Sequence, residues 1–382
     1  MHLMSRRLVA SAAAIVLGST ALVAASSASA TTSRTYTPTY TTLTMAHPYT
    51  PTAPAGSTDD YHCTVINPNL KADSYITSSN FSPGPTNAVE VHHAILFLVP
   101  PALVATALAA NQGGKGWTCF GETIFSKQSI PIPGVKNSVD MPEWLSGWAP
   151  GHGVDNAPKG TGVFFPKGSL VVLQIHYNML AGSGSVQSSL TLGTVPAAAK
   201  LKALSLDFFL APPDVPCPAS WNPATIALCQ RSNSMKYLGA RFGQSAIDFV
   251  NLVEAVCGRN PSNPPASDTT TCTWRYHRTA KIVEIAAHMH LTGSAFKVVL
   301  NPGSRTQKVL LNVKNFNFDF QRPYALKAPV AVRPGDRLQV TCTYNPKVHD
   351  FNPELKKALK RFVTWGDGSS DEMCLAMVST IS

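Results

Sequence analysis

Five histidines and one methionine stand where their side chains could bind a metal ion. His288 and His290 close an apolar run over residues 281–293, which we predict to be one long buried strand. Side chains two apart in a strand point to the same face about 6.6 Å apart, so these imidazoles can meet at one ion while Met289 points the other way. A pair of this kind can equally be a hydrogen-bonded core pair, and a metal site needs a third ligand from elsewhere.

Three other stretches offer that ligand. They contain His92 and His93, His176, and Met373. Neighbouring strand residues face opposite sides, so His92 and His93 can share an ion only where a bulge or a tight twist turns one of them. Taken singly, His176 is more often a core histidine and Met373 a packing residue.

The combination favours a soft metal. An imidazole without a partner in an apolar strand is costly, and all five histidines lie in such surroundings. Imidazole suits copper, zinc or iron, whereas a thioether selects Cu(I). Two imidazoles with Met373 therefore favour copper that cycles through Cu(I).

The elements that must position these residues are mostly strands. The chain has 382 residues, with 30 prolines and 25 glycines, which favours two domains built from short strands and turns. We predict strands at 89–99, 169–178, 188–194, 201–210, 273–291, 295–300, 307–313 and 337–344, and short helices near 102–110, 247–256 and 353–362. The strand at 169–178 is apolar on both faces and should be buried on both.

The N-terminus has the features of a secretory signal over residues 1–30. Arg6 and Arg7 precede an apolar run, and small residues follow at 28–30. An uncleaved membrane anchor is the alternative. Residues 31–58 are rich in Thr and Pro and are predicted to form a flexible tail. No other stretch is long and apolar enough to span a bilayer, so we expect an extracytoplasmic protein with no membrane contact after signal removal.

Charge and cysteine usage agree with export. Loss of the two leader arginines lowers the formal charge from +10 to +8, which indicates a solvated basic surface or an anionic co-substrate. No basic run with interleaved aromatics marks a nucleic-acid surface. The eight cysteines can form up to four disulfides in an oxidising compartment, and the absence of Cys-x-x-Cys argues against a zinc ribbon.

The order of the motifs resembles the copper type II ascorbate-dependent monooxygenases. His92-His93 comes first, then Leu-Gln-x-His-Tyr around His176, then His288-x-His290, then Glu-Met-Cys at 372–374. The resemblance covers residues 59–382. It implies an all-β fold of two tandem antiparallel β-sandwich, jelly-roll-like domains, 59–205 and 206–382. Each would hold one copper ion, across a solvent-filled cleft.

The resemblance also implies a role for each ligand. His92, His93 and His176 would form an all-nitrogen site that relays an electron, with Gln174 as a possible orienting neighbour or a plain core amide. His288, His290 and Met373 would form the site where O2 is activated. The implied reaction inserts one oxygen atom into an aliphatic C–H bond of a small substrate, with ascorbate as reductant.

Two disulfides follow from the resemblance, and four cysteines stay open. The implied pairs are Cys63 with Cys119 and Cys342 with Cys374; the second would fix the backbone beside Met373. Three pairings are possible for the others, which are Cys217, Cys229, Cys257 and Cys272.

The sequence departs from the peptidylglycine branch of that family at the substrate. Ala286 stands where that branch has an arginine, and Leu375 and Met377 stand where it has polar residues. We therefore expect no peptide-glycine substrate. Two other functions remain open: a secreted copper-binding or copper-trafficking protein without turnover, and a zinc hydrolase using His288, His290 and the isolated Glu284.

Overall fold

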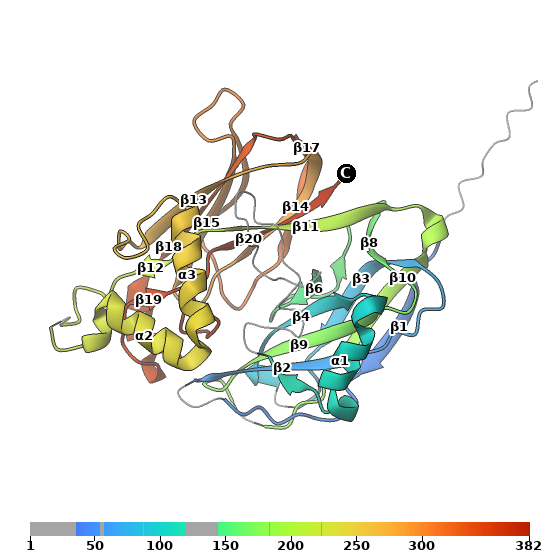
Figure 1. The fold of residues 1–382 in the computed structure, drawn as a ribbon, viewed down its shortest axis with the longest axis horizontal. Helices are drawn as coiled ribbons and strands as arrows, with labels where there is room; N and C mark the ends of the chain where they lie inside the picture. Colours follow the sequence, from blue (N-terminus) through green and yellow to red (C-terminus); the bar gives the residue numbers. More distant parts are fainter. Residues whose placement is uncertain (1–35, 54–56, 87, 120–143, 183, 223) are drawn as a thin grey trace, which may run out of the picture. The chain divides into compact units, whose positions relative to one another are not determined.

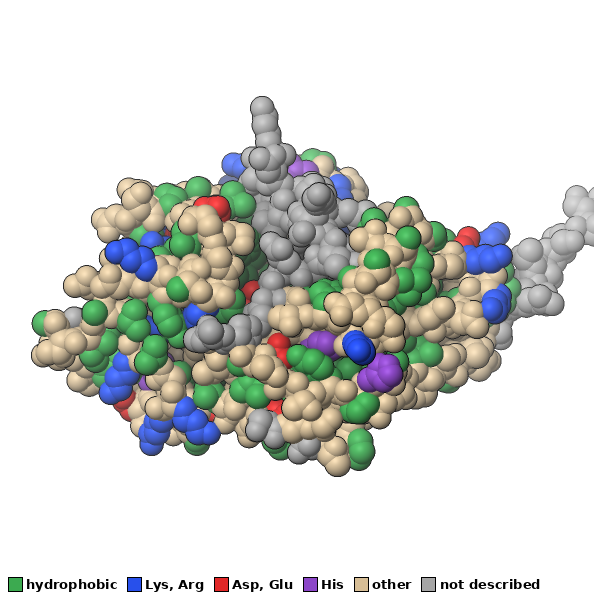
Figure 2. Space-filling model, turned by 60° about the horizontal axis from the view of Figure 1, so that its bottom comes forward, with side chains coloured by type: hydrophobic (Ala, Val, Ile, Leu, Met, Phe, Trp, Pro, Cys, Tyr) green, Lys and Arg blue, Asp and Glu red, His purple; other side chains and the backbone are tan. Residues whose placement is uncertain are grey.

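The computed structural model describes residues 36–53, 57–86, 88–119, 144–182, 184–222 and 224–382. The predicted signal at 1–30 and the first residues of the predicted tail lie outside these ranges. Within them, no helix is long and apolar enough to cross a membrane. Lysine and arginine side chains are scattered over the face shown in Figure 2 and do not gather in one patch, as expected for a solvated basic surface.

The N-terminal half is a two-layered β structure. One layer is a five-stranded sheet in the order β5-β2-β9-β4-β6, and the other is formed by β1, β10, β3 and β8, with β7 beside β3. Apolar side chains of both layers form one core, in which Leu96 and Leu173 pack with Phe81 and Leu190. The strands are β1 (Thr39–Thr44), β2 (Asp59–Ile66), β3 (Ser74–Ser82), β4 (Val91–Val99), β5 (Trp117–Thr118), β6 (Trp144–Trp148), β7 (Asp155–Asn156), β8 (Thr161–Phe165), β9 (Leu170–Asn178) and β10 (Ser189–Pro196).

The C-terminal half is also layered. A four-stranded sheet in the order β13-β18-β15-β16 packs on β11, β20, β14 and β17, with Phe296 and Val340 against Ile285 and Val378. The strands are β11 (Lys202–Leu210), β12 (Asp214–Val215), β13 (Thr269–Arg275), β14 (Ala280–His288), β15 (Gly293–Leu300), β16 (Lys308–Val313), β17 (Pro323–Val332), β18 (Arg337–Tyr344), β19 (Val363–Thr364) and β20 (Leu375–Ile381).

Strand β11 belongs to both halves. It pairs in parallel with β8 at one end and antiparallel with β20 along its length, so that one nine-stranded sheet runs through the chain. Figure 1 shows β11 extending from beside β8 to beside β20. The predicted domain boundary at 205/206 falls inside this strand.

Two predicted helices are confirmed and one is wrong. α1 (Val104–Ala110) and α3 (Gln244–Val256) form as expected, and α2 (Arg231–Phe242) precedes α3. The predicted helix at 353–362 is reduced to one 3-10 turn at Leu355–Lys357. Arg361 is drawn to the buried Asp371, and Phe362 donates its N–H to the carbonyl of Leu228, so the chain cannot continue as a helix.

The predicted flexible tail is wrong over residues 39–44. These residues form β1, which pairs along its whole length with β10. Met45 is buried in the core, and Tyr49 exchanges backbone hydrogen bonds with Val186. Threonine is β-branched and suits a half-buried edge strand, so the Thr-rich composition indicated a strand at least as well as a tail.

Candidate metal centre

The first ligand set depends on a β-bulge. In the pairing of β4 with β9, Val91 lies opposite Tyr177 and His93 opposite His176, so His92 is an extra residue with no partner of its own. A bulge of this kind turns one side chain out of strict alternation. Because of it, the adjacent His92 and His93 reach the same point, as the sequence analysis required.

Three ring nitrogens of this set converge. The Nδ1 atom of His92 lies 3.0 Å from Nδ1 of His176 and 3.0 Å from Nδ1 of His93. The Nδ1 atoms of His93 and His176 are 3.3 Å apart. The point equidistant from the three nitrogens lies about 1.8 Å from each, close to the ~2.0 Å of a metal–imidazole bond. A hydrogen bond between two ring nitrogens needs a hydrogen on one of them, and three nitrogens facing one point cannot all be satisfied by one another. A cation at that point can be bound by all three, so it fits this triangle better than hydrogen bonds do.

Asp59 fixes the outer side of His176. Its Oδ1 atom lies 2.8 Å from Nε2 of His176, and both side chains are fully buried. The ring of Tyr61 stacks on the same imidazole at 4.1 Å. Carboxylate–histidine pairs of this type set the tautomer and the orientation of a metal ligand. Sequence analysis missed Asp59, although its place directly before the apolar run of β2 was a signal.

The second set lies where β14 ends. The prediction of one strand over 281–293 is wrong: β14 stops at His288, the N–H of Gly293 donates to the carbonyl of His290, and β15 begins at Gly293. Met289 is fully buried in the C-terminal core, which agrees with its predicted direction. Gly293 is required here because a Cβ would lie 2.7 Å from Cβ of Met289.

The two histidines of this set keep nitrogens free of protein partners. Nδ1 of His288 lies 2.8 Å from the side-chain oxygen of Gln321, which leaves its Nε2 atom to point elsewhere. His290 is fully buried, and neither of its ring nitrogens has a hydrogen-bond partner in the described part of the chain. Such an orphaned imidazole is costly unless a ligand satisfies it. The donor set therefore fits a metal ion.

Glu372 brings Met373 to the level of His290. One oxygen of this buried carboxylate accepts the backbone N–H of His290 at 3.0 Å and that of Met373 at 3.3 Å; the other accepts from Thr292. The pairing of β14 with β20 ends where His288 lies opposite Leu375, and Met373 stands two residues before Leu375 in the chain. Sequence analysis quoted Glu372 only as part of a motif and missed this function.

The two sets touch each other. Ring centroids lie 5.9 Å apart for His93 and His288 and 6.5 Å apart for His92 and His290. Phe318 stacks on His92 at 4.1 Å. The expected solvent-filled cleft between the sets is therefore wrong for this structure, because aromatic side chains of both halves fill the space.

Residues 260–379 match the family model described as copper type II ascorbate-dependent monooxygenase, C-terminal domain. This stretch belongs to that family. It includes His288, His290 and Met373, so the family expected from the motifs is confirmed over the stretch that carries the second set.

Likeness to solved structures is weak. An allantoicase is 11% identical over 80% of this chain and 77% of that chain, with a TM-score of 0.18. The allantoicase of Saccharomyces cerevisiae is 10% identical over 84% and 77%, with a TM-score of 0.19. A fucolectin from striped bass (Morone saxatilis) serum is 8% identical over 91% and 99%, with a TM-score of 0.18. At such low TM-scores none of them informs the fold or the function of the monooxygenase stretch.

Four of the five candidate histidines are held uncharged. Burial, together with the neighbouring histidines, lowers the pKa of His92 and His93 well below the ordinary value. Burial also lowers the pKa of His288 to about 4 and that of His290 to about 3. Burial would raise the pKa of Asp59, but the hydrogen bond and electrostatic interaction with His176, together with the bonds from Ser369 and Thr58, outweigh it and bring the value to about 2. Neutral imidazoles are the form that binds a metal.

The two predicted disulfides are confirmed. Cys63 is bonded to Cys119 and Cys342 to Cys374, and the open set resolves as Cys217–Cys229 and Cys257–Cys272. The Cys342–Cys374 bond joins β18 to the residue after Met373. The amide of Gln174 donates to the carbonyl of Cys119 at 3.4 Å, which ties this buried side chain to the first disulfide.

An apolar wall continues from His288. Ala286 is paired with Met377 across β14 and β20, and Met377 with Phe208 across β20 and β11. Directly paired strand residues point to the same face, which is the face of His288. All three are only partly buried. At the far end burial, and then the charge of Asp155, raises the pKa of Glu284 to about 7.

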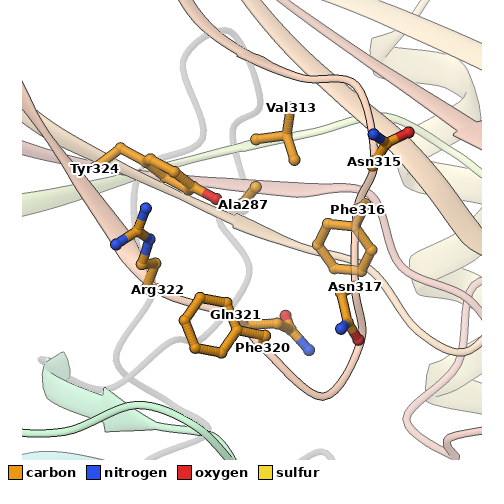
Figure 3. Close-up of a pocket in the computed structure, with 9 residues that line it drawn as sticks. All are labelled: Ala287, Val313, Asn315, Phe316, Asn317, Phe320, Gln321, Arg322 and Tyr324. Atoms are coloured by element: carbon orange, nitrogen blue, oxygen red, sulfur yellow. The ribbon is translucent and has the colours of Figure 1, made fainter.

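A small cavity lies behind this wall, on the other side of β14. It has a volume of about 60 Å³ and is lined by Ala287 of β14 and Tyr324 of β17, and by Phe316, Phe320, Gln321 and Arg322 from the loop between β16 and β17 (Figure 3). Ala287 points away from the face of His288, so the cavity is separated from the ligands by the strand and by Gln321. We assign no ligand to it.

Proposed function

We propose that the protein is a secreted copper-dependent monooxygenase that hydroxylates an aliphatic C–H bond of a small substrate with O2 and a reductant such as ascorbate. In this proposal His92, His93 and His176 hold one copper ion, and His288, His290 and Met373 hold the other. The observation that carries it is the convergence of three Nδ1 atoms within 3.0–3.3 Å in the half that the family match does not cover. A protein that used only the set within the matched stretch would have no use for these three converging histidines.

Bound copper supplies one-electron redox chemistry and activates O2, which the protein side chains cannot do by themselves. The chain supplies orientation. Asp59 and Gln321 each engage one ring nitrogen, of His176 and of His288, and thereby direct the other nitrogen to the metal. Neutral donors add no charge that would resist reduction to Cu(I), and the thioether of Met373 favours that state.

The chain also controls access. His92, His176 and His290 are buried, whereas His93, His288 and Met373 are only partly buried. O2 and substrate are therefore expected from the side of these three residues. The wall of Ala286, Met377 and Phe208 next to them offers apolar surface and no cation, which supports a substrate with an apolar reacting end and argues against a carboxylate there.

The test combines metal analysis with turnover. The purified mature protein should bind two copper ions per chain and consume O2 with ascorbate only when a suitable substrate is present. A panel of small amines, peptides and apolar alcohols should give turnover with apolar members and none with peptidyl-glycine. Two bound coppers without substrate-dependent O2 uptake on any compound would instead favour the trafficking protein.

The zinc hydrolase receives no structural support. Of the histidine, cysteine and carboxylate side chains that the structure describes, His92, His93 and His176 form a group whose ligand atoms all lie within 4.8 Å of one another. Glu284 forms no such group with His288 and His290. Its carboxylate accepts a hydrogen bond from the hydroxyl of Ser379 at 3.5 Å. The pair thus lacks the carboxylate that a catalytic zinc site of this type would need.

A further inference from the structure

A continuous run of buried hydrogen bonds joins the two ligand sets. It passes through residues 366–373, which we call the bridge segment. At its first end, Oδ1 of Asp59 accepts from His176 Nε2 at 2.8 Å, and from the backbone N–H and hydroxyl of Ser369 at 3.1 and 2.9 Å. One carboxylate oxygen therefore holds a first-set imidazole and the bridge segment together.

The other end of the bridge segment meets the second set. Glu372 accepts from the backbone N–H groups of His290 and Met373, and the segment ends at Met373 itself. A second contact runs alongside: the hydroxyl of Tyr61, which stacks on His176, donates to the carbonyl of Asp367 at 2.7 Å. Both sets thus share one short piece of backbone.

Buried ion pairs prevent the bridge segment from absorbing a local change. Asp371 binds Arg241 of α2 at 2.5 Å and Arg361 at 2.7 Å, and its other oxygen accepts the N–H of Gly368 at 3.0 Å. Asp371, Ser369 and Glu372 are each at most 1% exposed. A buried network of ion pairs and hydrogen bonds of this kind is rigid, so a shift at Ser369 is expected to be passed on to its neighbours.

We propose that Asp59 is a positioning residue for both ligand sets, acting on His176 directly and on Met373 through Ser369 and the bridge segment. The inference rests on the proposed function, in which both sets hold copper. Loss of an outer partner of a metal ligand typically lowers metal affinity 10–100-fold. The effect at the first set follows from contact. The effect at the second set, which Asp59 does not touch, is the specific consequence of the bridge.

The test measures each set separately in the full-length mature protein. Copper affinity of the first set is obtained by chelator competition, and second-set ligation from the Cu(I)–sulfur signal in X-ray absorption, which only Met373 can give among the proposed ligands. Asp59→Asn should weaken first-set affinity about 10–100-fold and also reduce the Cu(I)–sulfur signal. Ser369→Ala, which leaves His176 and Asp59 paired, should reduce the sulfur signal and weaken the first set several-fold.

Asp60→Asn is the matched control. Asp60 is an equally buried neighbour that accepts from the Tyr49 hydroxyl at 2.7 Å and from the N–H of Thr52 at 2.8 Å, and neither bond reaches the bridge segment. The Asp60→Asn substitution should leave the Cu(I)–sulfur signal unchanged.

Three other results would overturn the inference. A full sulfur signal in Asp59→Asn beside a weakened first set would overturn the inference and leave the proposed function standing. If Asp59→Asn does not fold, Ser369→Ala decides: wild-type behaviour at both sets overturns the coupling. A wild-type protein that binds no copper overturns the proposed function and the inference with it.

Discussion

The rings of His93 and His288 lie edge to face with their centroids 5.9 Å apart, although one belongs to β4 and the other ends β14. A second contact, between His92 and His290 at 6.5 Å, lies beside it. The two predicted sites are therefore one cluster of five imidazoles. This arrangement has consequences for the metals, for the residues around them and for stability.

With both sets loaded, the two Cu(II) ions should interact magnetically. Electron paramagnetic resonance should show a dipolar-broadened spectrum for the fully loaded protein and a sharp one for protein loaded with one equivalent. The reason is the ring contact between the sets, which leaves no room for a wide gap. A fully loaded spectrum that is the plain sum of two isolated Cu(II) signals would contradict it.

Removal of a ligand side chain should cost that set its metal, whereas the other set keeps all of its ligands. His176→Ala removes one corner of the nitrogen triangle, so metal analysis should show about one tightly bound copper per chain in place of two. Met373→Leu keeps both histidines of its set and should retain Cu(II), but should lose the Cu(I)–sulfur signal and the hydroxylation of any accepted substrate. Full hydroxylation by Met373→Leu would remove the basis for the second site.

The disulfide beside Met373 should matter to the second set. Replacing Cys342 and Cys374 with alanine should lower the free energy of unfolding by about 2–4 kcal/mol and weaken the sulfur signal, since the bond fixes the backbone next to the thioether. Removing Cys217 and Cys229 instead is the control. That pair closes a shorter loop away from the ligands, and its loss should leave the sulfur signal intact.

Gly293→Ala should disturb the second set without changing a ligand. The added Cβ would lie 2.7 Å from Cβ of Met289 and 3.1 Å from the carbonyl oxygen of His290, so the turn between the two strands must shift. We expect weaker copper binding at His288 and His290, with a smaller effect at the first set, measured by chelator competition. Gly153→Ala is the comparison: it lies between β6 and β7 without a positive φ, and no atom would meet the new Cβ within 4 Å.

Stability should fall as pH rises from about 5 to 9 through Glu254. Burial, and then the hydrogen bond and charge of Asp214, raise the pKa of this α3 side chain to about 9 from an ordinary 4.5. The folded state then keeps a proton that the unfolded state releases, so the stabilisation is complete below the ordinary pKa and is lost as pH passes the raised one. The expected slope is up to about 1 kcal/mol per pH unit.

Glu254→Gln should flatten this slope in denaturant titrations from pH 5 to 9, because a neutral amide cannot lose the proton. Asp248→Asn, a change of the same kind at an exposed position of α3, should leave the slope as it is. An unchanged slope in Glu254→Gln would mean that Glu254 is ionised in the folded protein, balanced by Arg231 and Arg259.

Residue types and spacing were sufficient for the strands that carry the histidines, for the metal preference and for the family, but not for β1 or for the end of β14. The apolar runs before His176 and His288 predict strands because alternation and length are local properties, and the thioether of Met373 favours copper wherever it lies. The bulge at His92 was foreseen as a requirement, since two adjacent histidines cannot otherwise share an ion.

Only the tertiary structure decided how these pieces meet. The end of β14 at His288, the shared oxygen of Asp59 and the contact between His93 and His288 depend on partners from distant parts of the chain. Local pattern carries no information about which buried carboxylate will face which imidazole, because that choice is made by packing between sheets. The sequence thus determined the ligands and their chemistry, and the fold determined that they form one joined centre.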